Sequence, residues 1–474
     1  MLLQLSPILL FIGLIGSGRV TTIVAALLAT IATMVVGWTS APQLSRFIEL
    51  LWFFTAGLWT ALPVVLVIIA GLFFAECVGR KNTVNPNLQK NHCSLANTCL
   101  IFGPFMETVT GFGVGYAIAL LSVKRLGIRD AEALALAAFS QFLVPWGALG
   151  IGTHLSAQIA GYPVEAIGWR CAVITTIACC FVLPLFWRVA ITSGLAPTRQ
   201  DRREWILTLA GLMSLLIVAN LIFPIEIAGM VSLGAVLVIR HLITHGAKSV
   251  TSSLLWTISP YIFLIVILAI MRLVPSLQGI FEYIVIQPLP EWPRFAPFMS
   301  PALPLLVISL IVTKQQGGMM AIREHGLTTL RKGWRTSVLT FLLIGMASIM
   351  IHAGMSGAVM KSATTFFGSA SPMLLTSAGA IGGYLTGSNA GAGAMSMPLA
   401  TALTLPSSSM MWIVAATIFA GSAMVAISPV RFTMGQGLIG ASFRSSQAGL
   451  RMFIPYASAT ITMSTLVVLF IGII

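Results

Sequence analysis

The sequence predicts an all-α polytopic membrane protein, and three observations support that fold class. Hydrophobic residues make up 57% of the chain and charged residues only 8%, far from the composition of a soluble globular domain. The apolar runs are continuous, whereas a membrane β-barrel would alternate apolar and polar residues. Several runs approach or reach the roughly 20 residues that cross a bilayer as a helix, among them Val20 to Val36, Ala61 to Cys77, Ile206 to Phe223 and Pro455 to Ile474.

Basic residues account for a net charge of +14, yet they form no long basic face. They are spread through short connections between apolar runs, which argues against nucleic-acid binding and follows the positive-inside rule. We therefore expect these connections to face the cytoplasm. They are Arg80 to Lys90, Lys124 to Arg129, Arg199 to Arg203, Arg240 to Lys248 and Lys314 to Arg335.

With those connections held inside, the chain has a consistent course of roughly 11 to 13 crossings. The stretch Leu95 to Val123 has basic connections on both sides, so it makes an even number of passes or a re-entrant hairpin. The stretch Val274 to Ser300 is rich in proline and aromatic residues and predicts an external connection with a partly embedded helix. Further helical segments are expected near Leu5 to Ile15, Val20 to Gly37, the run ending at Cys77, Glu132 to Ala160 with a break at Pro145, Trp169 to Val189, Trp205 to Phe223, Ile225 to Ile243, Leu254 to Leu273, Pro301 to Val312, Ser337 to Met355, Met410 to Ile427 and Pro455 to Ile474.

Two glycine-rich stretches interrupt the helical pattern most strongly, Gly103 to Leu120 and Gly382 to Pro406. Interrupted segments at corresponding places in two halves point to a transporter built from inverted repeats, each with a broken or re-entrant hairpin. Within a single transporter domain, we expect a first repeat at 1–205 with its broken segment at 95–123, middle helices at 206–335, and a second repeat core at 336–474 with its broken segment at 371–405.

Unwound backbone inside a membrane has N–H and C=O groups without helical partners, so it must face a cavity or a ligand. A half-helix that starts after such a break directs free N–H groups and its positive dipole end at the gap, which suits a carboxylate. Serine and asparagine carbonyls there can instead hold a sodium ion, and the glycines can serve close helix packing. Candidate substrate-binding residues are Thr110, Gly111, Gly113, Thr386, Gly387, Ser388, Asn389, Gly391 and Arg431.

Glu107 is the one acidic residue within these apolar stretches. Because low dielectric disfavours a bare charge, a buried carboxyl group can carry a proton near neutral pH, which is the property of a proton-coupling group. The alternative is a structural glutamate that is neutralised by a neighbour or satisfied by exposed backbone N–H groups.

Arg431 follows a proline that breaks an apolar helix, and two roles are open for it. Its guanidinium can pair with a carboxylate substrate or extend to the membrane interface, and the interface is the favoured alternative. His154 and His352 lie within or near apolar segments, where lone histidines are usually structural. The six cysteines lack zinc or disulfide spacing, and we expect no metal and no cofactor.

Several motifs resemble the L-lactate permease family. "FGPFMETVTGFGVGYAIALL" resembles the glycine-rich segment of that family, "WGALGIGT" its next broken segment, and "GGYLTGSNAGAGAM" with the later "AISP" its second signature. The resemblance covers most of the chain, from about Leu5 to the C-terminus. It implies a multi-pass transporter of the bacterial inner membrane that takes up lactate, glycolate or related 2-hydroxymonocarboxylates with protons, with Glu107, Gly111, Gly113, Ser388 and Asn389 at the site.

Departures from the family pattern fall in the presumed pocket and leave the substrate open among organic anions. Thr108, Val109 and Thr110 stand where the family usually has Gly-Ala-Ala, and Arg431 occupies a commonly uncharged position. Sodium coupling or exchange of another organic or inorganic anion is the alternative within transport. The sequence lacks an HExxH pair, a GxSxG elbow and a nucleotide loop, so an enzyme is not expected. A channel is a further alternative, and a homodimer is left open.

Overall fold

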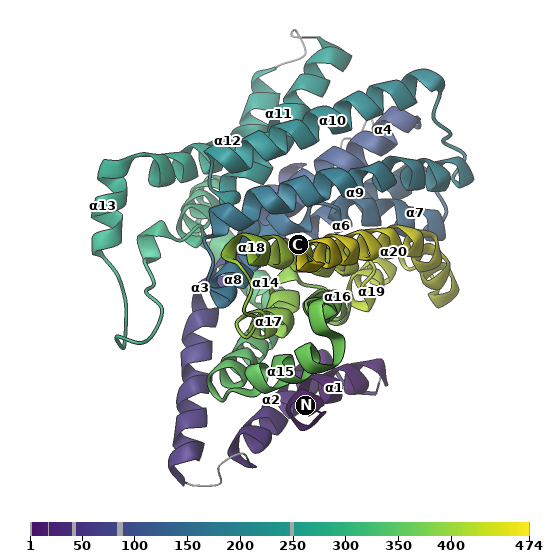
Figure 1. Ribbon diagram of the computed structural model, residues 1–474. Coiled ribbons are helices and arrows are strands. Elements are labelled where there is room, and N and C mark those ends of the chain that lie inside the picture. The colour runs from purple at the N-terminus through teal and green to yellow at the C-terminus, as the bar shows by residue number, and fades with distance from the viewer. Residues whose placement is uncertain (1, 18, 40–43, 83–88, 247–250, 474) are drawn as a thin grey trace.

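A computed structural model describes the chain apart from residues 1, 18, 40–43, 83–88, 247–250 and 474. The described residues form helices and one isolated β-bridge, between Ile286 and Phe295 (Figure 1). The helices of the first half are α1 Leu2–Gly16, α2 Thr22–Thr39, α3 Leu44–Asn82, α4 His92–Ala96, the π-helix η1 Asn97–Phe102, α5 Gly103–Thr110, α6 Val114–Arg125, α7 Asp130–Ala138, the 3-10 turns η2 Phe139–Gln141 and η3 Val144–Trp146, α8 Gly147–Ala160, α9 Val164–Thr192 and α10 Arg199–Ile222. Those of the second half are α11 Ile225–His245, α12 Ser252–Leu273, α13 Pro275–Tyr283, η5 Pro297–Met299, α14 Ala302–His352, α15 Met355–Phe367, η6 Gly368–Ala370, α16 Met373–Thr386, α17 Asn389–Ala400, α18 Ser407–Val425, α19 Pro429–Ile439 and α20 Phe443–Ile473.

Membrane-length helices dominate the structure, which confirms the all-α polytopic fold class. Among the described residues, eight helices are long and apolar enough to cross a membrane, or up to ten if each of two bent pairs is one span. Two further apolar helices, Leu2–Gly16 and Ala302–Gln315, are shorter than 18 residues. The 11 to 13 crossings expected from the sequence also counted short apolar segments of this kind.

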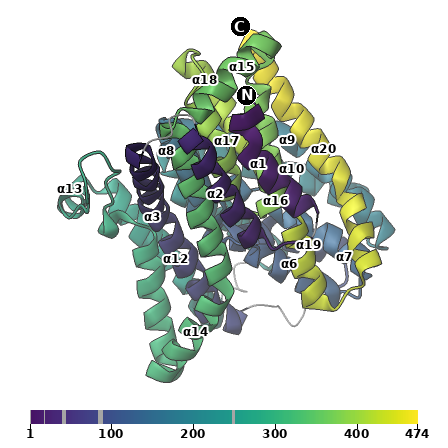
Figure 2. The ribbon, with the colours of Figure 1, turned by 90° about the horizontal axis from the view of Figure 1, so that it is seen from below.

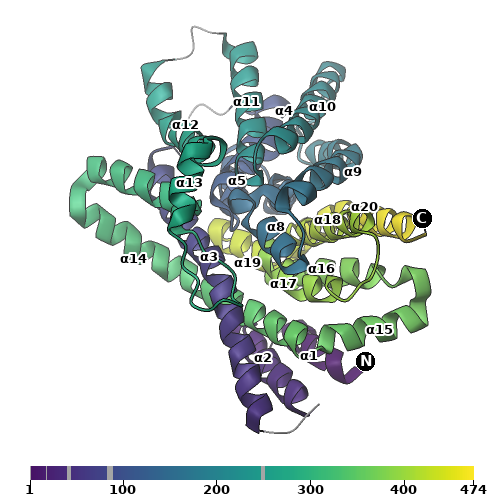
Figure 3. The ribbon, with the colours of Figure 1, turned by 60° about the vertical axis from the view of Figure 1, so that its left-hand side comes forward.

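Two buried apolar cores hold the bundle together. The larger core joins hairpin segments of the first half to α9, α18 and α20. The smaller core joins α1, α2, α3 and α14 to one face of α16 and α17. Helices α3 and α14 pack against each other (Figure 2) and cross in the view of Figure 3. Large apolar side chains remain exposed on the outer helices, as the lipid-facing surface of a membrane protein requires, including Leu207, Leu221, Ile243, Trp256 and Phe470.

Each glycine-rich stretch forms an antiparallel helical hairpin. Hairpin 1 consists of α4, η1 and α5 as its first limb and α6 as its second, and hairpin 2 consists of α16 and α17. Figure 2 shows α15, which leads into hairpin 2, at the upper edge, whereas α6 and α7 at the end of hairpin 1 lie in the lower half. The hairpins therefore enter the bundle from opposite sides, as an inverted repeat predicts.

A broken helix follows each hairpin. After hairpin 1, residues 130–141 and 144–160 form a helix pair bent by 59°, in agreement with the break expected at Pro145. After hairpin 2, α18 ends at Val425 and α19 begins at Pro429, where the sequence predicted a break, although Ser407–Ile439 forms one span of 33 residues without a sharp bend. The chain order of hairpin and then broken helix thus occurs twice.

Helix α14 differs from the sequence prediction. The segments Pro301 to Val312 and Ser337 to Met355 were expected as separate helices with a basic connection between them. Instead that connection is helical, and the element bends at Gly318, whose φ of 64° and ψ of −145° are not helical. Met319 and Met320 beside the bend are 79% and 85% exposed. Two other basic connections, Arg80 to Lys90 and Arg240 to Lys248, lie partly outside the described residues.

Candidate functional site

Hairpin 1 reverses direction through three residues with left-handed backbone. Gly111, Phe112 and Gly113 have φ values of 68°, 53° and 84°, a conformation that glycine adopts without steric cost. A Cβ atom on Gly111 would lie 2.4 Å from the Ala148 Cβ atom, so the tip packs directly on α8. The glycines therefore provide both the turn and the close approach of backbone to a neighbouring helix.

Glu107 caps the helix that starts after this turn. Its Oε1 accepts a hydrogen bond from the Gly113 N–H and its Oε2 accepts one from the Gly115 N–H, both at 3.0 Å. The side chain is 3% exposed. A carboxylate at a helix N-terminus meets both the free N–H groups and the positive end of the helix dipole. The contact matches the structural alternative considered for this residue, and it leaves the proton-coupling role a prediction.

Arg431 lies against the same carboxylate. Its Nη2 is 3.4 Å from Glu107 Oε1, and its side chain is 6% exposed. A Cβ atom on Gly113 would lie 2.0 Å from Arg431 Nη1, so only glycine leaves room for the guanidinium. The interface position favoured for Arg431 is therefore wrong, because its side chain is buried inside the protein against Glu107.

Hairpin 2 reverses direction at Gly387, which has a φ of 62°. The Thr386 hydroxyl donates to the Gly382 carbonyl at 2.7 Å and accepts from the Ser388 N–H at 3.2 Å. Ser388 is the N-cap residue of α17, yet its side chain makes no capping hydrogen bond, and the first turn holds no acidic residue. The positive end of α17 therefore has no counter-charge on its own hairpin.

Asn389 holds three helices together. Its Nδ2 lies 3.4 Å from the Thr153 hydroxyl of α8, and its Oδ1 accepts from the Ser422 hydroxyl of α18 at 3.0 Å. The Thr153 hydroxyl in turn donates to the Pro145 carbonyl at 2.6 Å, a group that the break before α8 leaves without a helical partner. Both ends of the Asn389 amide are thus used within the protein.

Each broken helix contacts both hairpin tips. Helix α8 packs on hairpin 1 at Ala148, and the site of a Cβ atom on Gly152 is 2.9 Å from the Asn389 Cβ atom of hairpin 2. Helix α19 contacts hairpin 1 through Arg431, and a Cβ atom on Gly387 would lie 2.9 Å from the Ser428 hydroxyl. Four interrupted segments therefore meet at one place inside the bundle.

The structure brings most of the predicted site residues to this junction, but two lie in other surroundings. The Thr110 hydroxyl donates to the Met106 carbonyl of its own helix at 2.6 Å and is fully buried. A Cβ atom on Gly391 would lie 2.4 Å from the Thr386 hydroxyl, so this glycine serves packing between the two hairpin limbs. Small-residue packing, the alternative considered for the glycines, describes Gly391 well.

Sequence reasoning missed Tyr116, Thr153 and Ser428. Tyr116 is fully buried, and among the described residues its hydroxyl has no hydrogen-bond partner. It stands in the motif "GVGYA", where a tyrosine among small apolar residues was a visible signal. Ser428 precedes Pro429, and a serine before a proline at a helix start is a recognisable N-cap pattern.

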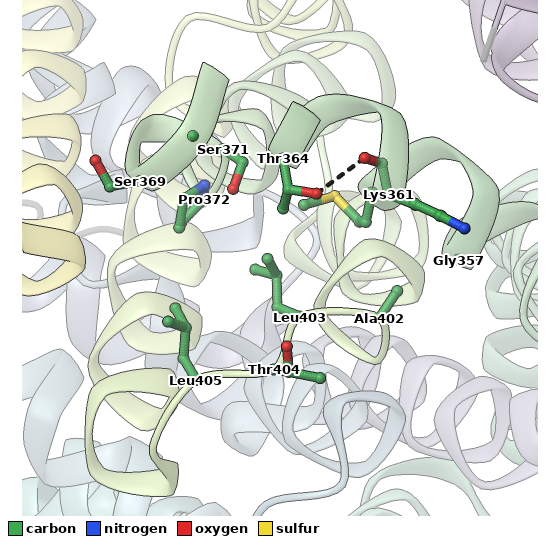
Figure 4. A pocket seen from close by; sticks show the side chains of 12 residues that line it. Gly357, Lys361, Thr364, Ser369, Ser371, Pro372, Ala402, Leu403, Thr404 and Leu405 are labelled. Atoms are coloured by element: carbon green, nitrogen blue, oxygen red, sulfur yellow. Dashed lines mark hydrogen bonds between the residues drawn. The ribbon is translucent and has the colours of Figure 1, made fainter. Parts of the chain in front are cut away.

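A groove of about 330 Å³ lies elsewhere, at the base of hairpin 2. Figure 4 shows Lys361 and Thr364 of α15 on one side and Ala402 to Leu405, which follow α17, on the other. None of the hairpin-tip residues lines it. Among the described residues, no group of three or more His, Cys, Asp or Glu side chains can hold a metal ion. His352 donates to or accepts from groups of Ser348 and stacks on Phe53, a structural role.

Comparison with protein-family models and with curated proteins finds no match for this chain.

Proposed function

We propose that the protein is a secondary active transporter of small organic anions that couples uptake to protons. Lactate, glycolate and related 2-hydroxymonocarboxylates are the proposed substrates, and the bacterial inner membrane is the proposed location. The observation that supports this function best is the meeting of two hairpin tips and two helix breaks at the buried Glu107–Arg431 pair.

Three features of that junction suit anion transport. Interrupted helices at a repeat interface are where carriers bind substrate, and their N-terminal ends attract anionic groups. The buried guanidinium of Arg431 is the side chain best suited to bind a carboxylate. The buried carboxyl group of Glu107 is a group on which a coupling proton can travel. The motif resemblance to lactate permeases supports the same substrate class.

Uptake of labelled L-lactate and glycolate into proteoliposomes tests the proposal. An inward proton gradient without sodium should drive accumulation above equilibrium, and a protonophore should abolish it. Unlabelled short organic anions added as competitors would identify the substrate. Uptake that appears only when sodium is supplied would support the sodium-coupled alternative, in which the carbonyl groups near Ser388 and Asn389 hold the cation.

Counterflow separates a carrier from a channel. Vesicles preloaded with unlabelled substrate should take up labelled substrate transiently against its gradient, because a carrier exchanges one molecule for another. Flux that does not saturate and shows no counterflow would contradict the transporter function, whatever ion accompanies the anion.

A further inference from the structure

The Glu107–Arg431 pair is buried and carries no net charge. The two side chains are 3% and 6% exposed, and they contribute one negative and one positive charge at the meeting point of the four interrupted segments. A bare charge in a low-dielectric surrounding is expensive, whereas a compensated pair is tolerated. The empty site is therefore electrically balanced.

The pair leaves donors unused. Arg431 contacts Glu107 through Nη2, whereas its Nε is buried and has no partner among the described residues. The Tyr116 hydroxyl is likewise buried and unpartnered there. The position of a Cβ atom on Gly435, one turn after Arg431 on α19, is 2.4 Å from that hydroxyl. Two unused donors thus lie on the same face of α19.

Several other charged groups on the helices that pack against α5 have partners of their own. Glu226 of α11 pairs with Arg272, and Arg240 of α11 binds Asn97 and Thr208. Glu76 of α3 pairs with Lys332. The His154 side chain of α8 forms no hydrogen bond or ion pair within the described part of the chain, whereas on α6 the nearby titratable group is Tyr116.

Adding a monocarboxylate to this site changes its net charge. Arg431 then faces two carboxylates, and the site carries one net negative charge away from water, which low dielectric penalises. One proton on Glu107 restores neutrality, because the carboxyl group loses its charge when the O–H bond forms on the oxygen that faces Arg431. No other bond is made or broken.

Building on the proposed function, we infer that the substrate carboxylate binds the Nε edge of Arg431 and the Tyr116 hydroxyl, and enters only together with one proton on Glu107. The loaded site and the empty site then have the same charge. Transport of a monocarboxylate is consequently electroneutral, with one proton for each anion, and Tyr116 is a substrate-binding residue.

The membrane potential tests this inference independently of the function itself. In proteoliposomes with labelled L-lactate, valinomycin and potassium gradients set the potential while the pH on each side is fixed. Wild-type initial rates should change less than twofold between an inside-positive and an inside-negative potential. Rates that change tenfold would overturn the inference and leave the transporter function intact. Absence of uptake of both lactate and glycolate would instead overturn the proposed function, and the inference with it.

Two variants sharpen the test. Glu107→Gln should lose its response to the pH gradient, and residual uptake should become potential-dependent because the anion now moves without a proton. Tyr116→Phe keeps all charges, so uptake should stay electroneutral while the lactate concentration for half-maximal rate rises about tenfold. The control is Tyr456→Phe, which removes the hydroxyl of another buried tyrosine. Tyr456 lies on α20 and packs against Phe139 and Phe453, and this variant should behave as wild type. Unchanged half-saturation in Tyr116→Phe would overturn its role.

Discussion

Hairpin 1 and hairpin 2 have the same design but opposite electrostatics at their tips. In both, a threonine ends the first limb, a glycine with positive φ makes the turn, and a short helix begins immediately afterwards. Hairpin 1 supplies its own anion, since Glu107 accepts from the first N–H groups of α6. Hairpin 2 supplies none, since the first turn of α17 holds no acidic residue and its N-cap makes no side-chain hydrogen bond. Under the proposed function, hairpin 1 holds the coupling group, and the N-terminus of α17 adds a second positive end near the substrate anion that Arg431 and Tyr116 bind.

Removing the α19 cation that pairs with hairpin 1 should have the largest effect. Arg431→Gln leaves the buried Glu107 carboxylate with backbone partners alone, and breaking a buried ion pair in this way costs about 3–5 kcal/mol. Thermal unfolding in detergent should show a correspondingly lower transition for this variant.

The double variant Glu107→Gln/Arg431→Gln provides the control for that prediction. It removes both charges, so it should recover most of the lost stability even though it transports no anion. A double variant as unstable as Arg431→Gln would show that the arginine acts by packing rather than by charge compensation.

Giving hairpin 2 an anion of its own should weaken substrate binding without damaging the fold. Ser388→Asp places a good N-cap residue at the start of α17, so stability should stay constant or rise by about 0.5–1 kcal/mol. Its charge repels an anionic substrate, and the concentration for half-maximal uptake should rise about tenfold or more. The asparagine of Ser388→Asn has nearly the same shape as the aspartate but carries no charge, so this variant should stay near wild type. Equal effects of the two substitutions would contradict anion binding at this tip.

The two turn glycines should respond unequally to alanine. Either substitution forces an L-residue into a left-handed conformation, at a cost of about 1–2 kcal/mol. Gly113→Ala also drives a methyl group to within 2.0 Å of the Arg431 guanidinium, whereas Gly387→Ala makes a milder overlap, 2.9 Å from the Ser428 hydroxyl and 3.0 Å from the Val430 Cβ atom. Uptake measured alongside thermal unfolding should therefore show the greater loss of transport in Gly113→Ala. Equal transport at equal stability would show that Gly113 is needed only for its φ.

The smallest contrast concerns the two threonines that end the first limbs. Thr110→Val removes a hydrogen bond to the carbonyl of its own helix, so transport should stay within twofold of wild type. Thr386→Val leaves the Ser388 N–H without its acceptor, which should cost about 1–2 kcal/mol and loosen the tip. Transition temperatures and uptake rates of the two variants provide the comparison, and a large loss of uptake in Thr110→Val at unchanged stability would place that hydroxyl at the site after all.

The sequence predicted the interruptions well because their causes are local. The glycine runs, Pro145 and Pro429 can be recognised in the sequence alone, and each marks a break in a helix. The positions of Thr110 and Arg431 could not be predicted in the same way. Whether a hydroxyl bonds its own helix or faces a cavity depends on helix rotation, and the inward direction of Arg431 depends on Glu107, which lies 324 residues earlier in the chain.

Helix α14 is a second case in which the local sequence did not determine the structure. Its basic connection carries the composition of a surface loop, so a break was predicted between two short helices. Lysine, arginine, glutamine and alanine are also good helix formers, and the helix simply extends beyond the membrane. Only the bend at Gly318 depends on a residue with special backbone freedom.

That bend gives the molecule a chemical marker of sidedness. The 36 residues from Gly317 to His352 extend roughly 54 Å as a helix, against about 30 Å of hydrocarbon, so we expect the exposed Met319 and Met320 at the end of that helix to lie in water at one face of the membrane. Thioethers in water are readily converted to sulfoxides. An oxidant that does not cross lipid should therefore modify this pair in vesicles of one orientation and spare it in the other, and mass spectrometry of the peptide would reveal which face of the membrane the bend occupies.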